Sequence, residues 1–313
     1  MADSPSRIRI ATRESRLAMT QTEHVAATLA ARHPGLAVEI VGMTTKGDRV
    51  LDRPLAEVGG KGLFIKELEI ALDDDLADIA VHSLKDVPME VPPQFAVSTF
   101  GEREVPLDAF VCGRFASLEA LPDGSMVGTS SLRRECQLRR AFPRLRFRAL
   151  RGNVNTRLAK LDAGEYDAII LAAAGLRRLG FGDRIRAVLP DTLTVPAIGQ
   201  GVLAIEYRRD REDLGRLVAA FEHRDTAAAA RAERALGLVV EGSCTVPVGG
   251  FARVSGDVLS IEGFLGMPDG SRVVRRRASG RVDQAEEIGA DLGRQLLAAG
   301  GAEILRSLAA MKA

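Results

Sequence analysis

The sequence predicts an α/β protein whose last third changes to an α+β pattern. Over the first two thirds, short apolar runs alternate with helical patterns, which is typical of βαβ units. After Asp225 an alanine-rich helix precedes alternating apolar stretches with glycine turns and a final helical region. The length of 313 residues is too great for one compact unit and leaves room for two or three domains.

The elements of this α/β pattern follow in order along the chain. Strands are expected at 8–11, 38–41, 79–81, 109–111, 126–127, 147–150, 168–171 and 202–205. Helices are expected at 16–31, 63–72, 131–141, 154–163, 226–237 and from Asp283 onward. Residues 44–62 are rich in glycine and poor in periodicity, so they predict a long loop. No internal repeat is visible in the sequence.

Composition excludes several classes of protein. A hydrophobic fraction of 46% with 27% charged residues argues against disorder. The longest apolar run, 168–176, is far shorter than the roughly 20 residues that cross a membrane. No signal-type segment is seen, and the three cysteines lack Cys-x-x-Cys spacing. We therefore expect a cytoplasmic protein with free thiols and no membrane partner.

Arginine is concentrated in one part of the chain. Only six of the 43 basic residues are lysine, and nine arginines with a single acid, Glu135, lie between Arg133 and Arg157. Such an excess indicates an anionic partner, either nucleic acid or a small molecule with several carboxylates or phosphates. The aromatic fraction of 4%, without tryptophan, offers few surfaces on which bases could stack, so no nucleic-acid partner is expected.

Two expected helix starts carry these arginines. Residues 129–134 read Thr-Ser-Ser-Leu-Arg-Arg, and residues 150–157 read Leu-Arg-Gly-Asn-Val-Asn-Thr-Arg. Free N–H groups at a helix start bind anions, whereas arginine there opposes the helix dipole. Arginines placed where they cost helix stability indicate that an anion binds nearby, and two such helix starts facing each other would form a basic groove. Each helix start alone is also compatible with an ordinary capped surface helix.

Residues 82–88, His-Ser-Leu-Lys-Asp-Val-Pro, follow an apolar strand, at the end of the sheet where α/β proteins bind ligands. Asp86 could act there as a general acid or base. From these residues alone, a Lys85–Asp86 pair that fixes the turn is the favoured alternative. The histidines and cysteines lack ligand spacing, so no metal site is expected.

Cys244 lies in the small-residue loop 241–247, whereas Cys112 falls in an apolar strand and Cys136 in a helix. An accessible thiolate can be a nucleophile or a point of covalent attachment. No histidine lies within twenty residues of Cys244, so protease-type catalysis is not supported.

With these residues in place, the chain resembles the porphobilinogen deaminase family. The matching stretches occur in order and span nearly the whole chain: 10–15, 59–64, 82–88, 128–134, 151–157, 166–172, 174–176, 199–201 and 241–244.

The resemblance implies two lobes like those of type II periplasmic binding proteins, with a cleft between them, and a small C-terminal α+β domain. The implied domains are 1–102 with 201–220, 103–200, and 221–313, and the chain would cross between the lobes near residues 103 and 200. The implied activity deaminates porphobilinogen and joins four units head to tail into hydroxymethylbilane, a step of haem and other tetrapyrrole biosynthesis.

The resemblance also assigns roles to residues. A dipyrromethane cofactor would be attached to Cys244 by a thioether, and Asp86 would be catalytic. Cofactor contacts would come from Ser83, Lys85, Thr129, Ser131, Arg133 and Arg134. Substrate contacts would come from Arg13, Ser15, Lys61, Ser130, Arg151, Arg157, Arg178 and Gln200. Each added pyrrole brings two carboxylates, so we expect the arginines to act on this polyanion and not on folding.

The resemblance further implies a monomer whose product passes to uroporphyrinogen-III synthase. The alternative is a non-catalytic anion-binding protein of the same bilobal fold, which would need neither Cys244 nor Asp86.

Overall fold

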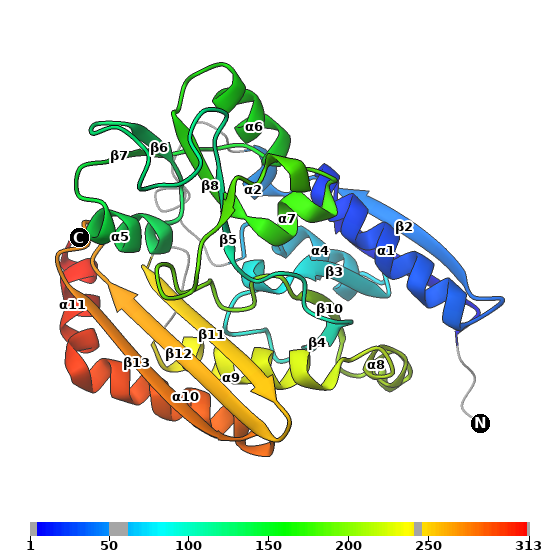
Figure 1. Cartoon of the computed structure of the whole chain (residues 1–313). Helices are drawn as coiled ribbons and strands as arrows, with labels where there is room; N and C mark the ends of the chain where they lie inside the picture. The colour runs from blue at the N-terminus through cyan, green and yellow to red at the C-terminus, as the bar shows by residue number, and fades with distance from the viewer. Residues whose placement is uncertain (1–4, 50–61, 241–245, 312–313) are drawn as a thin grey trace.

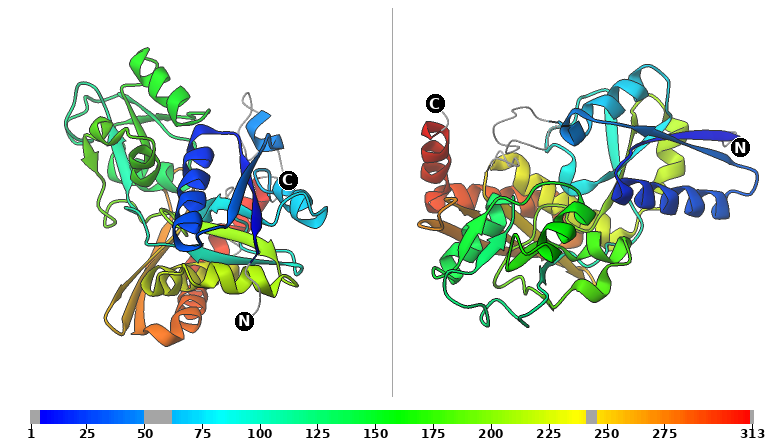
Figure 2. Two further views of the ribbon diagram at one scale, coloured as in Figure 1. Left: turned by 90° about the vertical axis from the view of Figure 1, so that its right-hand side faces the viewer. Right: turned by 90° about the horizontal axis from the view of Figure 1, so that it is seen from above.

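The computed structural model describes residues 5–49, 62–240 and 246–311. Two mixed sheets with helices on both faces form two lobes, and a third, antiparallel sheet with its own helices packs against them (Figures 1 and 2). The α/β class with an α+β C-terminal domain is therefore confirmed.

The first lobe is built on a sheet of order β2-β1-β3-β10-β4. Its strands are β1 (Arg7–Arg13), β2 (Ala37–Met43), β3 (Ile79–Ser83), β4 (Phe95–Phe100) and β10 (Leu203–Arg208). β1 is parallel to β2 and β3, and β10 is antiparallel to β3 and β4. Its helices are α1 (Arg16–Arg32), α2 (Lys46–Arg49), α4 (Lys66–Asp73) and α8 (Glu212–Ala219). Because side chains alternate along a strand, Ile8 and Ile10 pack with α1 while Ala11 packs with α4.

The second lobe repeats this strand order as β7-β6-β8-β5-β9. Its strands are β5 (Asp108–Val111), β6 (Met126–Gly128), β7 (Arg146–Arg148), β8 (Ala168–Ala172) and β9 (Ala187–Val188), and its helices are α5 (Leu132–Ala141), α6 (Val154–Asp162) and α7 (Ala173–Arg178). In each lobe the strand next to one edge is antiparallel to both of its neighbours: β10 in the first lobe and β5 in the second. The chain enters each of these two strands from the other lobe. The two lobes share this strand order although the sequence shows no internal repeat. Strand order requires only a similar pattern of apolar positions, so it can repeat without any visible sequence similarity.

Two crossing segments, 101–107 and 189–202, join the lobes and lie against each other. The Glu104 amide donates to the Gly201 carbonyl at 3.2 Å. Gly201 has φ +88°, and a Cβ there would lie 2.3 Å from the Glu104 carbonyl oxygen. Only glycine meets both conditions, so the crossing segments can approach this closely.

The C-terminal domain has an antiparallel sheet of order β11-β12-β13. Its elements are α9 (Arg224–Val239), β11 (Val248–Ser255), β12 (Val258–Gly266), β13 (Val273–Arg281), α10 (Ala285–Leu296) and α11 (Ala302–Ala310). One face of the sheet packs on these helices through residues such as Leu236, Ile261 and Leu292. Gly289 lets α10 approach α9, because a Cβ there would lie 2.0 Å from the Ala232 carbonyl oxygen.

Some elements differ from the expected ones. The loop expected at 44–62 begins with α2, and residues 50–61 lie outside the described part of the chain. The helix expected at 63–72 begins at Lys66, and the sequence did not indicate β4 or α7. α7 continues directly from β8 without a side-chain cap, so no polar residue marks where the strand ends.

Candidate active site

Asp86 lies on a short turn held between buried residues. β3 pairs with β1 on one side and β10 on the other, and its last residue, Ser83, precedes the 3-10 turn Leu84–Asp86. The Leu84 amide donates to the Val202 carbonyl at 3.0 Å, and both Leu84 and Val87 are buried. Asp86 between them is exposed. The fold therefore fixes the backbone on both sides of Asp86 through a hydrogen bond and burial, and leaves Asp86 accessible.

Lys85 does not fix this turn by pairing with Asp86. Both residues belong to the described part of the chain, and no ion pair within 4.0 Å joins their side chains. The turn is held instead by backbone hydrogen bonds and by burial of its apolar residues. The alternative favoured from the local sequence, a turn-fixing ion pair, is therefore wrong.

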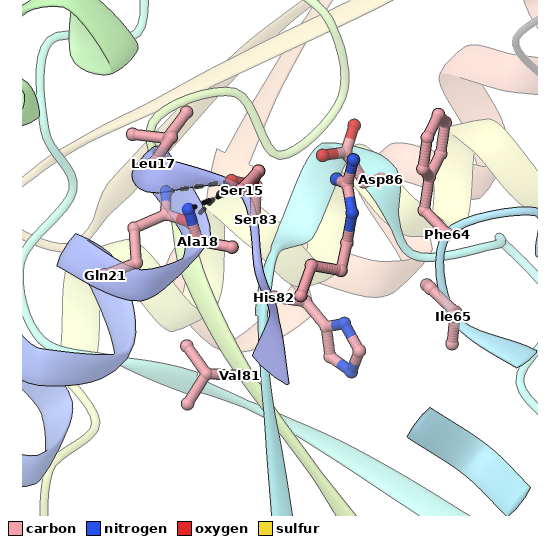
Figure 3. Close-up of a pocket in the computed structure, with 11 residues that line it drawn as sticks. Ser15, Leu17, Ala18, Gln21, Phe64, Ile65, Val81, His82, Ser83 and Asp86 are labelled. Atoms are coloured by element: carbon pink, nitrogen blue, oxygen red, sulfur yellow. Dashed lines mark hydrogen bonds between the residues drawn. The ribbon is translucent and has the colours of Figure 1, made fainter. Parts of the chain in front are cut away.

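A pocket on the first lobe brings Asp86 together with Arg13 and Ser15 from the end of β1 and the start of α1. Figure 3 shows Ser15 and Ser83 on one side of Asp86 and Phe64 on the other. The Arg13 guanidinium carbon lies 4.2 Å from the centre of the Phe64 ring, a cation–π contact that orients the side chain. Ser15 also caps α1 by accepting from the Ala18 amide at 3.4 Å.

Gln21 belongs to this pocket although sequence reasoning missed it. Its amide nitrogen donates to the Ser83 hydroxyl at 2.9 Å, and the two side chains lie together in Figure 3. Gln21 shares the buried face of α1 with Val25 and Leu29, at a spacing of four residues. A glutamine in such an apolar stripe could have indicated the site from the sequence, because a buried polar side chain needs a hydrogen-bond partner.

The two arginine-bearing helix starts of the second lobe are joined by a hydrogen bond. Ser131 caps α5 by accepting from the Arg134 amide at 3.4 Å, and buried Thr129 accepts from the Ser131 amide at 3.2 Å. The Ser130 hydroxyl donates to the Leu150 carbonyl at 2.7 Å, which joins the start of α5 to the segment that leads into α6.

Arg133 and Arg134 differ from what the sequence suggested. Both are buried, and both pair with Asp108 at the start of β5, at 2.9 Å and 2.8 Å. Arg133 also donates to the Val195 carbonyl at 2.6 Å. A buried carboxylate that depends on two guanidinium groups is part of the folded framework. The expectation that the arginines play no part in folding is therefore wrong for these two.

Gln200 is likewise part of the framework. Its side chain is 1% exposed, and its amide nitrogen donates to the Pro106 carbonyl at 2.7 Å and to Asp108 at 2.9 Å. The direct substrate contact expected for Gln200 is therefore not supported.

The remaining cations of the site lie within electrostatic range of one another across the lobe boundary. Burial lowers the pKa of Lys85 to about 8, with Asp86 and Asp108 opposing the shift and Arg134 and Arg133 adding to it. Burial, Arg134 and Arg151 similarly lower the pKa of Arg157 to about 10. Burial is the main cause of both shifts, and the contributions of charge show that Lys85 of the first lobe and the arginines of the second lie close enough to affect one another, with Asp86 and Asp108 opposing part of their positive charge.

Arg151, Arg157 and Arg178 have guanidinium N–H donors without a hydrogen bond to the described residues. The Arg151 Nε atom is buried without a hydrogen-bond partner there, and burial lowers the pKa of this residue. Arg157 donates through Nε to the Gly152 carbonyl, and Arg178 through Nη2 to the Gly201 carbonyl, both at 2.8 Å. Guanidinium groups with free donors bind carboxylates in pairs of hydrogen bonds, so this wall suits a ligand with several carboxylates.

Lys61 and Cys244 lie outside the described residues. Cys112 and Cys136 are buried, and burial raises the pKa of Cys136 to about 12. Within the described ranges, no group of three or more His, Cys, Asp or Glu side chains could hold a metal ion. No helix in the described part of the chain is both long and apolar enough to span a membrane.

Comparison with known proteins gives the same assignment along nearly the whole chain. Residues 8–216 match the family model described as porphobilinogen deaminase, dipyromethane cofactor binding domain, and residues 227–298 match that of the porphobilinogen deaminase C-terminal domain. The chain belongs to the porphobilinogen deaminase family. As a member, it is a transferase of tetrapyrrole biosynthesis that uses a dipyrromethane cofactor, deaminates porphobilinogen and joins four units into hydroxymethylbilane.

Relatives of this family match over nearly their full length. The porphobilinogen deaminase of Nitrosomonas europaea is 54% identical over 98% of this chain and 99% of its own length. That of Chromobacterium violaceum is 54% identical over 97% and 98%. The non-catalytic alternative is not favoured by these matches.

Solved structures that match part of the chain include two binding proteins. The methionine-binding protein MetQ is 16% identical with a TM-score of 0.43, over 74% of this chain and 95% of its own. The aliphatic sulphonate-binding protein SsuA of Escherichia coli is 14% identical with a TM-score of 0.40, over 77% and 73%. The description of the two lobes rests on the strand order of the chain itself.

Proposed function

We propose that Asp86 is the catalytic acid and base of porphobilinogen deamination in this chain. The observation that carries the proposal is its position: an exposed carboxylate on a rigid turn, at the edge of a pocket lined by Arg13 and Ser15. Protonated Asp86 would deliver a proton to the amine of porphobilinogen, which leaves as ammonia. The resulting carboxylate would then stabilise positive charge beside the pyrrole nitrogen and take up the proton lost when two rings join.

The cations around Asp86 would hold the carboxylates of the substrate and of the growing chain. Arg13 and Ser15 would bind from the first lobe, and Arg151, Arg157 and Arg178 from the second, with Ser130 at the start of α5. The support is that the guanidinium groups of the second-lobe arginines are desolvated and lack any acidic partner in a described ion pair. Lys61 stays a predicted further contact.

The described residues suit the dipyrromethane cofactor, whose pyrroles carry carboxylates. Lys85, Ser83, Thr129, Ser131 and Arg134 would hold it, with Arg133 fixed behind them by Asp108. When bound, the cofactor supplies the pyrrole to which the first substrate unit is joined. We propose Cys244 as its attachment point, because the thiols of Cys112 and Cys136 are buried in the folded protein.

We propose that the chain acts as a cytoplasmic monomer and that its product passes to uroporphyrinogen-III synthase. Free cysteines fit a reducing compartment. The exposed large apolar side chains are distributed over separate elements, among them Ile70 on α4, Val188 on β9 and Val258 on β12, and so suggest no extensive apolar interface. Light scattering that gave the mass of a dimer would contradict the monomer.

The test of Asp86 uses Asp86→Asn and Asp86→Glu in the full chain. Asp86→Asn should fold normally and lose roughly 10² to 10⁴ in turnover, the range typical of a lost general acid or base. Asp86→Glu should retain part of the activity, because the carboxylate remains. Asp74→Asn, at an exposed residue at the end of α4, is the matched control and should match wild type. Asp86→Asn turning over at the wild-type rate would refute the assignment.

A further inference from the structure

Asp108 joins helix α5 to the second crossing segment. It is the first residue of β5, fully buried, and accepts hydrogen bonds from Arg133 Nη1 and Nη2 at 2.9 and 3.1 Å. Arg134 Nε and the Gln200 amide donate to it at 2.9 Å each. Although burial opposes ionisation, Arg133 and Arg134 hold the pKa of Asp108 well below its usual range, so the carboxylate is charged.

The same cluster is bonded to both crossing segments. Arg133 donates to the Val195 carbonyl at 2.6 Å, and Gln200 donates to the Pro106 carbonyl at 2.7 Å. Arg134 donates to the Ile170 carbonyl of β8 at 3.2 Å. Helix α5, whose start carries the proposed cofactor contacts Ser131 and Arg134, is therefore tied through one carboxylate to its own sheet and to the connections between the lobes.

Asp108 also acts on the first lobe through charge. Lys85 lies within electrostatic range of Asp86, Arg134, Asp108 and Arg133. With Asp108 in place, the three buried groups Asp108, Arg133 and Arg134 carry a net charge of +1. Without it, two guanidinium groups would repel each other in a desolvated site and would both oppose the charge of Lys85.

We infer that Asp108 is a positioning residue for the tetrapyrrole-forming reaction, which fixes the orientation of Arg133 and Arg134 and sets the positive charge that faces Lys85. This inference rests on the proposed function of the site. A purely structural ion pair would affect only the stability of the fold. The role inferred for Asp108 also makes the electrostatics at Lys85 depend on it.

The first experiment compares Asp108→Asn with Asp162→Asn in the full-length enzyme. Asp162 is the matched control, since it pairs with Arg184 at 2.6 Å on the exposed surface of the same lobe. Asp108→Asn should lose roughly 10²-fold in kcat/KM, the scale of a displaced binding group, while Asp162→Asn stays at the wild-type value.

The second readout is the pH dependence of Lys85 acylation, followed by peptide mass spectrometry. Its midpoint should fall below the wild-type value of about 8 in Asp108→Asn, because a negative charge that favours protonated Lys85 is gone. A variant with reduced stability but an unchanged Lys85 midpoint and unchanged turnover per folded molecule would overturn the inference.

A double variant keeps the test decisive if Asp108→Asn does not fold. Asp108→Asn with Arg133→Met removes one charge of each sign, and replacing both members of a buried pair is often close to neutral for stability. It should recover the unfolding midpoint but not kcat/KM, because Arg134 still lacks its carboxylate. Full recovery of kcat/KM would overturn the inference. If the proposed function itself were wrong, Asp86→Asn would be active, and this result distinguishes that failure from a failure of the inference about Asp108.

Discussion

Glu233 of α9 joins the C-terminal domain to both crossing segments, and its removal should be among the most damaging single changes. The side chain is fully buried and pairs with Arg103 of the first crossing segment at 2.6 and 3.2 Å. It also accepts from the Gly199 amide of the second crossing segment at 2.7 Å and from the Ala252 amide of β11 at 2.8 Å.

Glu233→Ala leaves the partly buried Arg103 without its carboxylate partner, although Arg103 Nε still donates to the Gln200 carbonyl, and leaves the backbone amides of Gly199 and Ala252 without a partner. Removing one member of a buried ion pair costs about 3–5 kcal/mol. Each unpartnered amide adds about 1–3 kcal/mol. The free energy of unfolding should therefore fall by at least ~5 kcal/mol, a large part of the about 5–15 kcal/mol by which proteins are stable.

Guanidinium unfolding of the full chain, followed by circular dichroism, measures this loss. Glu212→Ala is the control, because Glu212 makes only an exposed pair with Arg216, and should change stability by less than ~1 kcal/mol. Glu233→Gln should fall between the two, since its amide oxygen can still accept from a backbone amide. A loss below ~2 kcal/mol for Glu233→Ala would refute the reasoning.

Three further results are expected. Arg133→Leu should lower the free energy of unfolding by about 3 kcal/mol in the same assay, while Arg184→Leu, from an exposed pair, should cost less than ~1 kcal/mol; equal effects would contradict the role assigned to Asp108. Folding lowers the pKa of Lys85 from 10.5 to about 8, so the unfolded chain keeps this proton to higher pH. Protonated, buried Lys85 lowers the free energy of unfolding by its full amount below pH 8, and this loss fades towards pH 10.5. The free energy of unfolding of the wild type should therefore rise relative to that of Lys85→Met between these two pH values. Parallel plots of this free energy against pH for the two proteins would contradict the shift. The KM for porphobilinogen should increase with salt because screening weakens attraction to the arginines, and a KM independent of salt would argue against capture by charge.

Local sequence patterns predicted much of the fold and part of the site. The alternation of strands and helices, the turn at Asp86 and the two capped helix starts each depend on residues close together in the sequence. Ser131 illustrates this, since its cap is three residues from the amide that it accepts from. Such features follow from hydrogen-bonding rules that act within a few residues.

The partners of Arg133 and Gln200 could not be predicted in this way. Asp108 lies 25 residues from Arg133 and 92 from Gln200, and it meets them only when the lobes and crossing segments are assembled. In the sequence, an aspartate before a short strand resembles a turn residue, and arginines after a serine cap resemble ligand contacts. Burial distinguishes the framework arginines from those that keep free donors, such as Arg151, and burial is a property of the complete fold.

If this chain assembles tetrapyrrole on a dipyrromethane held by Cys244, the intact mass of the purified active enzyme, followed by peptide mapping, will show it. The mass should exceed that of the sequence by one dipyrromethane, with the adduct on Cys244, and Cys244→Ser should fold without the adduct and without activity. An active enzyme at the unmodified mass, or an adduct on Cys112 or Cys136, would show that the tetrapyrrole is not built on Cys244.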